Sequence, residues 1–368
     1  RPDAMISTNT SGLQIGLLAG DRSESFRRRF LGTHFFNPPR YLKLLELIPT
    51  EDTDPLAVQA MTHFLESKVA RRVVQAKDTP GFIANRFGMW AMFHAIHVAE
   101  KLHLTAEQVD LITGTFLGRP RSGSFRLNDI VGLDIMQDIA SNLIQRCPED
   151  PYLATLNTPR TMSWLLERGW VGDKAGQGFY RREGRELVTL DFNTLAYREK
   201  ADVDLPSLQG VAKKPLGERL SAALDFRDEV GEYLREYLVP CLQYANYLKD
   251  DISHNVQDFD RVMMWGFGWE MGPFAMIDAI GANKLSISDG PFYSDLGVWA
   301  KGTYSQPTDE PQYRRVQDFD IVKSMESLNV RELGDGVQVA ALTTKMGVIA
   351  PAVVRELTEL MHSGSSDR

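Results

Sequence analysis

Two polar residues lie within two apolar, strand-like segments of the chain. His34 belongs to residues 30–36, and Glu46 belongs to residues 42–48. Alternate residues of a strand share a face, so each of the two polar residues lies in a row of apolar neighbours. A carboxylate buried alone is costly, so we expect Glu46 to be paired with His34. Such a carboxylate fixes the imidazole tautomer and raises its basicity, which makes His34 a candidate general base for a hydroxyl proton. A structural pair at a sheet edge fits the same spacing equally well.

Two further polar residues are candidates for contact with a ligand. Ser11 precedes Gly12 where a predicted strand ends, a common place for a ligand-facing hydroxyl. Asn85 lies at helical spacing from Phe82 and Met89, which places its amide on an apolar stripe. Taken alone, Ser11 is better explained as a turn or cap residue, and Asn85 as a buried amide bonded to backbone.

Several other patterns do not support a site. Residues 266–272 contain three glycines, but they are one residue too long for a dinucleotide-binding turn and no strand precedes them. His94, His97 and His103 lack zinc-ligand spacing, and the two cysteines, Cys147 and Cys241, cannot form a ligand set. We therefore expect no metal site.

The segments around His34 and Glu46 alternate between strand and helix. This alternation predicts an α/β layer with a partly parallel sheet. The predicted strands are 4–7, 30–36, 42–48 and 69–76, and the predicted helices are 13–29 and 53–68. Thr79 is expected to cap a helix with Pro80 at its first position, and the pattern stays helical to about residue 186.

A second helical stretch, residues 228–281, follows a polar connector and resembles the first. Asp, Phe, Asp and Gly recur at intervals of 15, 4 and 3 in the first stretch and 14, 4 and 3 in the second. An internal duplication explains this spacing, and coincidence between two amphipathic helical pairs is the alternative. The residues concerned are Asp110, Phe125, Asp129 and Gly132, then Asp260, Phe274, Asp278 and Gly281.

Composition and charge exclude some classes of function. The 368 residues are 43% hydrophobic and carry a net charge of -8, with no basic block, so nucleic-acid binding is not expected. No apolar run is long enough for a membrane span, and the cysteine usage fits a reducing cytoplasm. The chain does not open with methionine, so we expect residue 1 to be a cut within a longer protein.

Several segments in the same order resemble the 3-hydroxyacyl-CoA dehydrogenase family. The fold that this resemblance implies is a Rossmann domain followed by a helical domain that shapes an acyl-CoA cleft and often dimerises. The matching segments are residues 9–11, 34–38 (HFFNP), 43–46 (KLLE), 78–86 (DTPGFIANR), 131–134 (VGLD) and 172–180 (GDKAGQGFY).

The resemblance also implies roles for single residues. His34 would be the general base and Glu46 its orienting partner. Ser11 and Asn85 would position the 3-oxygen of the substrate. Asn37 and Lys174, with Ser11, would lie near the NAD cofactor. The implied reaction is the NAD-dependent oxidation of a (3S)-3-hydroxyacyl-CoA to the 3-ketoacyl-CoA, a step of fatty acid β-oxidation in the cytoplasm.

The second helical stretch and the tail resemble bacterial multifunctional enzymes that fuse a dehydrogenase with an enoyl-CoA hydratase. On this basis the helical copies would form a homodimer or an internal pseudo-dimer, and a thiolase is a possible partner. The alternative is a non-catalytic acyl-CoA-binding or assembly module. The expected parts are residues 1–78 (the C-terminal portion of the Rossmann domain), 79–186 (first helical domain), 187–227 (connector), 228–320 (second helical domain) and 327–368 (start of a crotonase-like domain).

The family's Rossmann domain should contain a strand, a glycine-rich turn and a helix that hold the NAD pyrophosphate. The printed sequence contains no such unit before residue 79. We therefore expect these residues alone to be inactive as a dehydrogenase. The tail is expected to form a strand, a tight turn and a strand up to Leu342, then a helix over 353–361, with residues 363–368 disordered.

Overall fold

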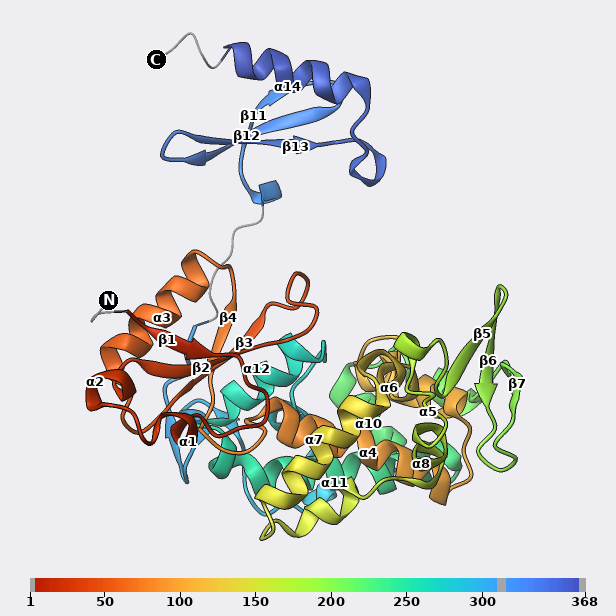
Figure 1. Ribbon diagram of the computed structural model, residues 1–368. Helices are drawn as coiled ribbons and strands as arrows, with labels where there is room; N and C mark the ends of the chain where they lie inside the picture. The colour runs from red at the N-terminus through yellow and green to blue at the C-terminus, as the bar shows by residue number, and fades with distance from the viewer. Residues whose placement is uncertain (1–3, 310–315, 364–368) are drawn as a thin grey trace. The chain divides into compact units, whose positions relative to one another are not determined.

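The computed structural model describes residues 4–309 and 316–363, which fall into two compact units, residues 1–308 and 309–368 (Figure 1). We describe each unit by itself. The first unit contains a four-stranded sheet, a large group of helices and two small antiparallel sheets. The second contains one antiparallel sheet and one long helix.

The N-terminal sheet runs in the order β1-β2-β3-β4, and its strands are β1 (Ile6–Thr8), β2 (Phe30–Phe35), β3 (Leu44–Pro49) and β4 (Arg72–Gln75). The β1–β2 and β3–β4 pairs are parallel and the central β2–β3 pair is antiparallel, which confirms the partly parallel sheet. In the central pair, His34 lies directly opposite Glu46. The antiparallel register therefore brings the two polar residues together.

The helices beside this sheet differ from expectation at one place. The predicted single helix over residues 13–29 is wrong, because the chain forms α1 (Ile15–Ala19) and α2 (Glu24–Arg27) instead. The carboxylate of Asp78, which follows β4, accepts hydrogen bonds from the first two N–H groups of α1, and Ser23 caps α2 separately. The predicted helix over 53–68 is confirmed as α3 (Pro55–Ser67).

The long helix α4 (Ala84–Lys101) begins later than the sequence indicates. The predicted cap at Thr79 is wrong, since its hydroxyl is buried without a hydrogen-bond partner among the described residues. Glu46 takes the capping role, because its Oε1 accepts the N–H groups of Ile83 and Ala84, each at 3.0 Å. A carboxylate from β3 thus caps a helix that starts 38 residues later in the chain.

The helical part is interrupted by strands that the sequence pattern did not reveal. The prediction of helix up to residue 186 is wrong beyond α8 (Arg160–Leu166), because strands begin before that residue. The expected connector, residues 187–227, itself contains strands and two helices. Both small sheets are three-stranded antiparallel meanders. The elements after α4 are α5 (Ala106–Thr113), η1 (Thr115–Leu117), α6 (Phe125–Val131), α7 (Leu133–Arg146), η2 (Pro151–Leu156), α8 (Arg160–Leu166), η3 (Asp173–Ala175), β5 (Tyr180–Glu183), β6 (Glu186–Leu190), β7 (Tyr197–Glu199), α9 (Pro206–Val211), α10 (Leu216–Ala223), α11 (Glu229–Ile252), α12 (Val256–Gly266), α13 (Pro273–Ile280), η4 (Ala282–Leu285), β8 (Tyr293–Ser294), β9 (Gly297–Ala300) and β10 (Thr303–Ser305).

A half-buried aspartate in α5 and a buried one in α12 make the same set of hydrogen bonds. Each accepts two backbone N–H groups at the start of the next helix and one tyrosine hydroxyl from the meander that follows. For Asp110 the donors are Phe125 N, Arg126 N and Tyr180 Oη, at 2.6, 3.1 and 2.7 Å. For Asp260 they are Phe274 N, Ala275 N and Tyr293 Oη, at 2.8, 2.9 and 2.8 Å.

A second pair of aspartates repeats this likeness one helix later. Asp129 of α6 accepts N–H groups from the two residues that lead into the first meander, each at 2.8 Å. Asp278 of α13 does the same at the second meander, at 2.9 and 2.8 Å. In both stretches, therefore, hydrogen bonds to two aspartate carboxylates connect two helices to the first strand of a meander.

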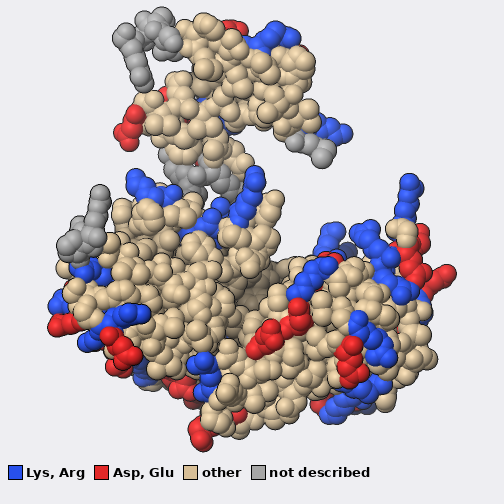
Figure 2. All heavy atoms as spheres, in the orientation of Figure 1, with Lys and Arg blue, Asp and Glu red and all other residues tan. Residues whose placement is uncertain are grey.

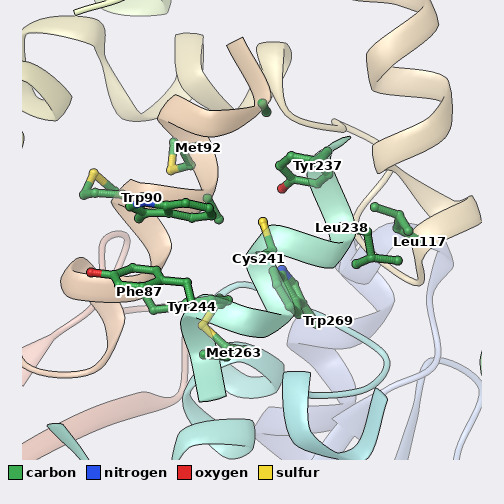
Figure 3. Packing of buried hydrophobic residues seen from close by; sticks show 14 of the residues in the cluster. Phe87, Trp90, Met92, Leu117, Tyr237, Leu238, Cys241, Tyr244, Met263 and Trp269 are labelled. Carbon is green, nitrogen blue, oxygen red and sulfur yellow. The ribbon is translucent and has the colours of Figure 1, made fainter. Parts of the chain in front are cut away.

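The core between the helices is rich in aromatic residues. Trp90 of α4 lies 4.8 Å, ring centre to ring centre, from Tyr244 of α11, and Phe87 lies 5.2 Å from Phe259 of α12. Figure 3 shows Phe87 and Trp90 of α4 close to Tyr244 of α11 and Met263 of α12, all members of one core cluster. Such large buried rings dominate the burial of apolar surface and hold α4 against the second helical stretch.

The second unit is small and follows the predicted order. Its sheet has the order β11-β12-β13, with β11 (Ile321–Ser324), β12 (Leu328–Gly334) and β13 (Val337–Leu342), and the helix is α14 (Pro351–Ser363). The expected strand, turn, strand and helix are thus confirmed. Residues 364–368, most of the tail predicted to be disordered, lie outside the described residues.

The buried aspartates predict a dependence of stability on pH. Burial raises the pKa of Asp110, Asp129 and Asp260 to about 7, although the hydrogen bonds that each accepts lower it in part. In the unfolded chain an Asp has a pKa of about 3.9. The folded state therefore binds more protons than the unfolded state between these values, and the free energy of unfolding should fall as pH rises from about 4 to about 7.

We expect Asp260→Asn to reduce this loss of stability, by up to about 1.4 kcal/mol per pH unit, because it removes one of the three shifted groups. Urea unfolding at pH 5 and pH 7.5 measures the effect. Asp21→Asn, at an exposed position, is the control and should leave the pH dependence unchanged. Equal pH dependence in the wild type and in Asp260→Asn would contradict the shift.

Candidate active site

His34 and Glu46 form a buried hydrogen-bonded pair, as the sequence predicted. His34 Nδ1 lies 2.7 Å from Glu46 Oε2, and the two residues are 5% and 0% exposed. A carboxylate can only accept, so Nδ1 carries the proton and Nε2 is left with a free lone pair. The hydrogen bond therefore leaves Nε2 as the ring atom that can accept a proton from a ligand.

The other oxygen of Glu46 is held by the start of α4. Its two bonds from Ile83 N and Ala84 N bring the total on this carboxylate to three. The N-terminus of an 18-residue helix carries partial positive charge, which favours the ionised carboxylate there. One side chain thus joins β3, β2 and α4.

Two aromatic rings hold the imidazole of His34 from the sides. The ring of Phe36 lies 5.0 Å from that of His34, and the ring of Phe82 lies 5.7 Å away. Phe82 precedes α4 and has a positive φ of 49°. In this backbone conformation its ring lies against the imidazole. Packing and the hydrogen bond together fix the orientation of the base.

Ser11 and Asn85, which the sequence suggested only weakly, are brought together. Asn85 Nδ2 donates to the backbone oxygen of Ser11 at 3.0 Å, and the side chain of Asn85 is buried. The structural explanation of Asn85, a buried amide bonded to backbone, is therefore confirmed. The same bond nonetheless places the exposed Ser11 beside the start of α4, one residue from the Ala84 N–H that binds Glu46.

Sequence reasoning missed two residues that position this loop. Asn9 Oδ1 accepts the N–H of Phe35 at 3.0 Å, which ties the end of β1 to the residue after His34. Asp78 caps α1 at 2.6 and 2.7 Å and so fixes the other end of the Ser11 loop. The signal for Asp78 was its place directly after a strand, but the sequence could not show that it caps an earlier helix.

Asn37 and Lys174, suggested for cofactor binding, are less closely connected to the pair. Asn37 is exposed just after β2. Lys174 Nζ lies 2.6 Å from Asp134 Oδ2 at the start of α7, and both side chains are about half exposed. No printed contact joins Lys174 to His34 within the described residues, so its role stays a prediction.

A cavity of about 190 Å³ lies beside Ser11. Ser11, Gly12 and Pro80 form one wall, and one face of α7, with Asn142 and Arg146, forms the other. Figure 2 shows this side of the first unit hollowed between its sheet-containing and helical parts, with charged side chains on the rim. Of the four candidate residues His34, Glu46, Ser11 and Asn85, only Ser11 lines this cavity.

In the described parts of the chain, no group of three or more His, Cys, Asp or Glu residues could hold a metal ion. Among the same residues, no helix combines the length and apolar character needed to cross a membrane.

Comparison with known proteins identifies the family. Residues 1–79 match the family model described as 3-hydroxyacyl-CoA dehydrogenase, NAD binding domain, and residues 81–182 match its C-terminal domain. The chain belongs to the 3-hydroxyacyl-CoA dehydrogenase family. This confirms the resemblance drawn from the sequence, together with a Rossmann-like part followed by a helical one.

Two relatives extend over the whole chain. A "Probable 3-hydroxyacyl-CoA dehydrogenase" of Bacillus subtilis (strain 168) is 37% identical over 94% of this chain and 44% of its own length. A "Putative fatty acid oxidation complex trifunctional enzyme" of Rickettsia prowazekii (strain Madrid E) is 29% identical over 100% of this chain and 51% of its own length. The chain thus spans about half the length of the curated relatives that it matches.

A solved structure shares the fold. The 3-hydroxybutyryl-CoA dehydrogenase of Escherichia coli K12 matches 77% of this chain and 70% of its own chain, with a TM-score of 0.53 and 19% identity. The match covers more of this chain than the 182 residues reached by the family models.

The three bonds on Glu46 predict its contribution to stability. Glu46→Ala leaves His34 Nδ1 and two buried N–H groups without an acceptor, and each orphaned buried donor costs about 1–3 kcal/mol. We expect the free energy of unfolding to fall by roughly 3 kcal/mol or more, measured by urea denaturation. Glu51→Ala, at an exposed position, is the control. A change below about 0.5 kcal/mol, typical of surface substitutions, would contradict the capping role.

Proposed function

We propose that this chain supplies the proton-transfer site and the substrate side of an NAD-dependent 3-hydroxyacyl-CoA dehydrogenase, which oxidises a (3S)-3-hydroxyacyl-CoA to the 3-ketoacyl-CoA in fatty acid β-oxidation. The observation that carries this proposal is the buried His34–Glu46 pair at 2.7 Å, with Glu46 anchored on α4. A pair of this kind leaves one imidazole nitrogen free to act as a base.

In the proposed reaction, His34 Nε2 takes the proton of the 3-hydroxyl while the C3–H bond breaks. When bound, NAD accepts the hydride from C3, so the substrate loses one proton and one hydride and becomes the ketone. The imidazolium that results lies against the carboxylate of Glu46, which stabilises its charge until the proton leaves. In the reverse direction the same imidazolium protonates the developing alkoxide.

Ser11 and Asn85 are proposed to align the 3-oxygen with His34. The Asn85–Ser11 bond holds the end of the β1 loop against the start of α4, and Ser11 is exposed toward the cavity that it lines. A hydroxyl there can donate to the substrate oxygen as negative charge develops on it. The two residues thus supply orientation, while His34 moves the proton.

The described residues offer candidate contacts for the nicotinamide end of NAD but not for its pyrophosphate. Ser11 and Asn37 are exposed at the ends of β1 and β2, next to the candidate base, and are proposed to contact the nicotinamide end together with Lys174. The pyrophosphate normally binds at the N-terminus of a helix that follows a strand and a glycine-rich turn. Residues 4–79 contain no turn of that kind.

We expect residues 1–368 alone to bind NAD more weakly than micromolar and to produce no measurable NADH. Without pyrophosphate contacts the nicotinamide is not positioned against C3, and positioning can supply roughly 7–11 kcal/mol of a barrier. Calorimetric titration with NAD, and NADH formation from 3-hydroxybutyryl-CoA, measure both expectations. Micromolar binding, or turnover at the rate of the natural protein that contains these residues, would show that another part of the chain holds the pyrophosphate.

The role of His34 is tested in the natural protein that contains these residues. His34→Gln should lower kcat by about 10²–10⁴ in the NADH-linked assay with acetoacetyl-CoA, because it removes the group that gives the proton to the developing alkoxide in this direction. His63→Gln, on the outer helix α3, is a matched control and should keep normal turnover. Near-normal kcat in His34→Gln would overturn the assignment of the base.

The larger architecture is proposed on the likeness of the two helical stretches. We infer that residues 79–186 and 228–320 are copies of one domain, supported by the matching bonds on Asp110 and Asp260 and by the meander that follows each. The packing of α4 against α11 favours an internal pseudo-dimer over a homodimer. The relative named as a trifunctional enzyme supports a multifunctional protein, with residues 327–368 starting a crotonase-like domain and a thiolase as a possible partner.

The competing proposal is a non-catalytic acyl-CoA-binding or assembly module, in which His34 and Glu46 have only a structural role. Both proposals allow acyl-CoA binding, but only the enzyme requires His34 for turnover. The His34→Gln assay therefore separates them, provided that the variant still binds acyl-CoA in a calorimetric titration.

A further inference from the structure

A small apolar cavity of about 30 Å³ lies between α4 and the second helical stretch. Its walls come from α4, from the loop after η1, from α11, and from α12 with the residues after it. Figure 3 shows Met92 on α4, Tyr237 on α11, Met263 on α12 and Trp269, which follows α12, among the core side chains of this region. The largest lining side chains are Met92, Arg119, Tyr237, Met263, Phe267 and Trp269.

Phe267 separates this cavity from His34. Its ring lies 6.4 Å from that of Phe36, edge to face, and Phe36 in turn lies 5.0 Å from His34. On its other side the ring rests on the backbone of α4, since a Cβ at Gly88 would lie 2.5 Å from Phe267 Cζ. Phe36 and Phe267 therefore link His34 to the cavity through successive ring contacts, and Phe267 is the one of the two that lines the cavity.

We propose that Phe267 is a specificity-determining residue that limits the length of the acyl chain. The inference rests on the proposed function, because it takes the acyl group bound at His34 as the group that extends toward Phe36. Beyond Phe36 the chain meets the ring of Phe267, and the space behind that ring is no larger than about one methylene group. The enzyme is accordingly specific for short acyl chains.

The far wall of the cavity supports this limit. Arg119 lies over the ring of Trp269, with its guanidinium carbon 3.9 Å from the ring centre, and donates to Tyr237 Oη at 2.6 Å. A guanidinium is a poor neighbour for an alkyl chain, because desolvating it further gains nothing in return. A long chain therefore meets first a bulky ring and then a fixed charge.

The same geometry predicts that the limit can be lifted. Each methylene moved from water into an apolar site contributes about 0.8 kcal/mol, or roughly fourfold in affinity. Removing the ring of Phe267 opens the path into the space between Met92 and Met263, with room on the order of a few methylenes. Binding of a longer chain should then improve by about tenfold or more.

The experiment is a calorimetric titration of residues 1–368 with 3-hydroxybutyryl-CoA and 3-hydroxydecanoyl-CoA. For the wild type we expect the two ligands to bind with affinities within about fourfold, because the extra methylenes of the longer ligand have no apolar site to occupy. For Phe267→Ala we expect the longer ligand to bind at least about tenfold more tightly than in the wild type, with the shorter one unchanged within about threefold. Phe267→Leu should lie between the two and replaces Phe267→Ala if that variant does not fold.

Phe116→Ala is the control, because Phe116 is a phenylalanine of the same hydrophobic core, more deeply buried than Phe267, that does not line the cavity. It should leave the ratio of the two affinities unchanged, which excludes a general effect of loosened packing. Tight binding of the longer ligand by the wild type, or an unchanged ratio in both Phe267 variants, would overturn the inference and leave the proposed function standing. Failure of the wild type to bind the shorter ligand would instead overturn the proposed function.

Discussion

The carboxylate of Glu46 is the point on which the site depends. A fully buried carboxylate must be compensated by hydrogen bonds, and Glu46 finds three, one from His34 and two from the start of α4. Since the bonds come from different elements, satisfying this one charge sets the register of β2 on β3 and the place where α4 begins. The chemistry of the imidazole and the attachment of the helical part to the sheet thus share a single cause.

The helical part uses the same physical device for a different purpose. Asp110 and Asp260 are also buried carboxylates at helix starts, but each accepts a tyrosine hydroxyl in place of an imidazole. A tyrosine hydroxyl whose pKa is raised by burial and by the adjacent aspartate gives up no proton near neutral pH, so these sites hold structure only. Glu46 differs because its partner is an imidazole, whose second ring nitrogen can accept a proton, whereas the tyrosine hydroxyl has no second site of that kind.

The features that sequence could predict are those set by local periodicity. The alternation of apolar residues located β2 and β3 closely, and the helical period located α3 and the start of the second helical stretch. One polar residue in each of two neighbouring strands was enough to predict the His34–Glu46 pair. The wrong predictions concern caps that come from distant parts of the chain. Thr79 and Pro80 are typical of the start of a helix, yet α4 begins only at Ala84, because the carboxylate of Glu46 accepts the backbone N–H of that residue. Likewise β5 and β7 are short and polar, with no alternation to reveal them, and are held by Asp129 and by neighbouring strands.

The second helical stretch is more than a distant repeat, because its α12 packs on the same strands that carry the base. A Cβ at Gly266 would lie 2.6 Å from Leu44 Cδ2 and 3.3 Å from Phe36, so the end of α12 fits against β3 and the residue after β2 only because it lacks a side chain there. This close approach is what places Phe267 beside Phe36. A mechanism confined to residues 1–182 would therefore leave out one wall of its own site. His34, Glu46 and Phe267 come from three regions of the chain. Glu46 is held by hydrogen bonds to the start of α4, His34 by Glu46 and two aromatic rings, and Phe267 by close packing on α4 at Gly88.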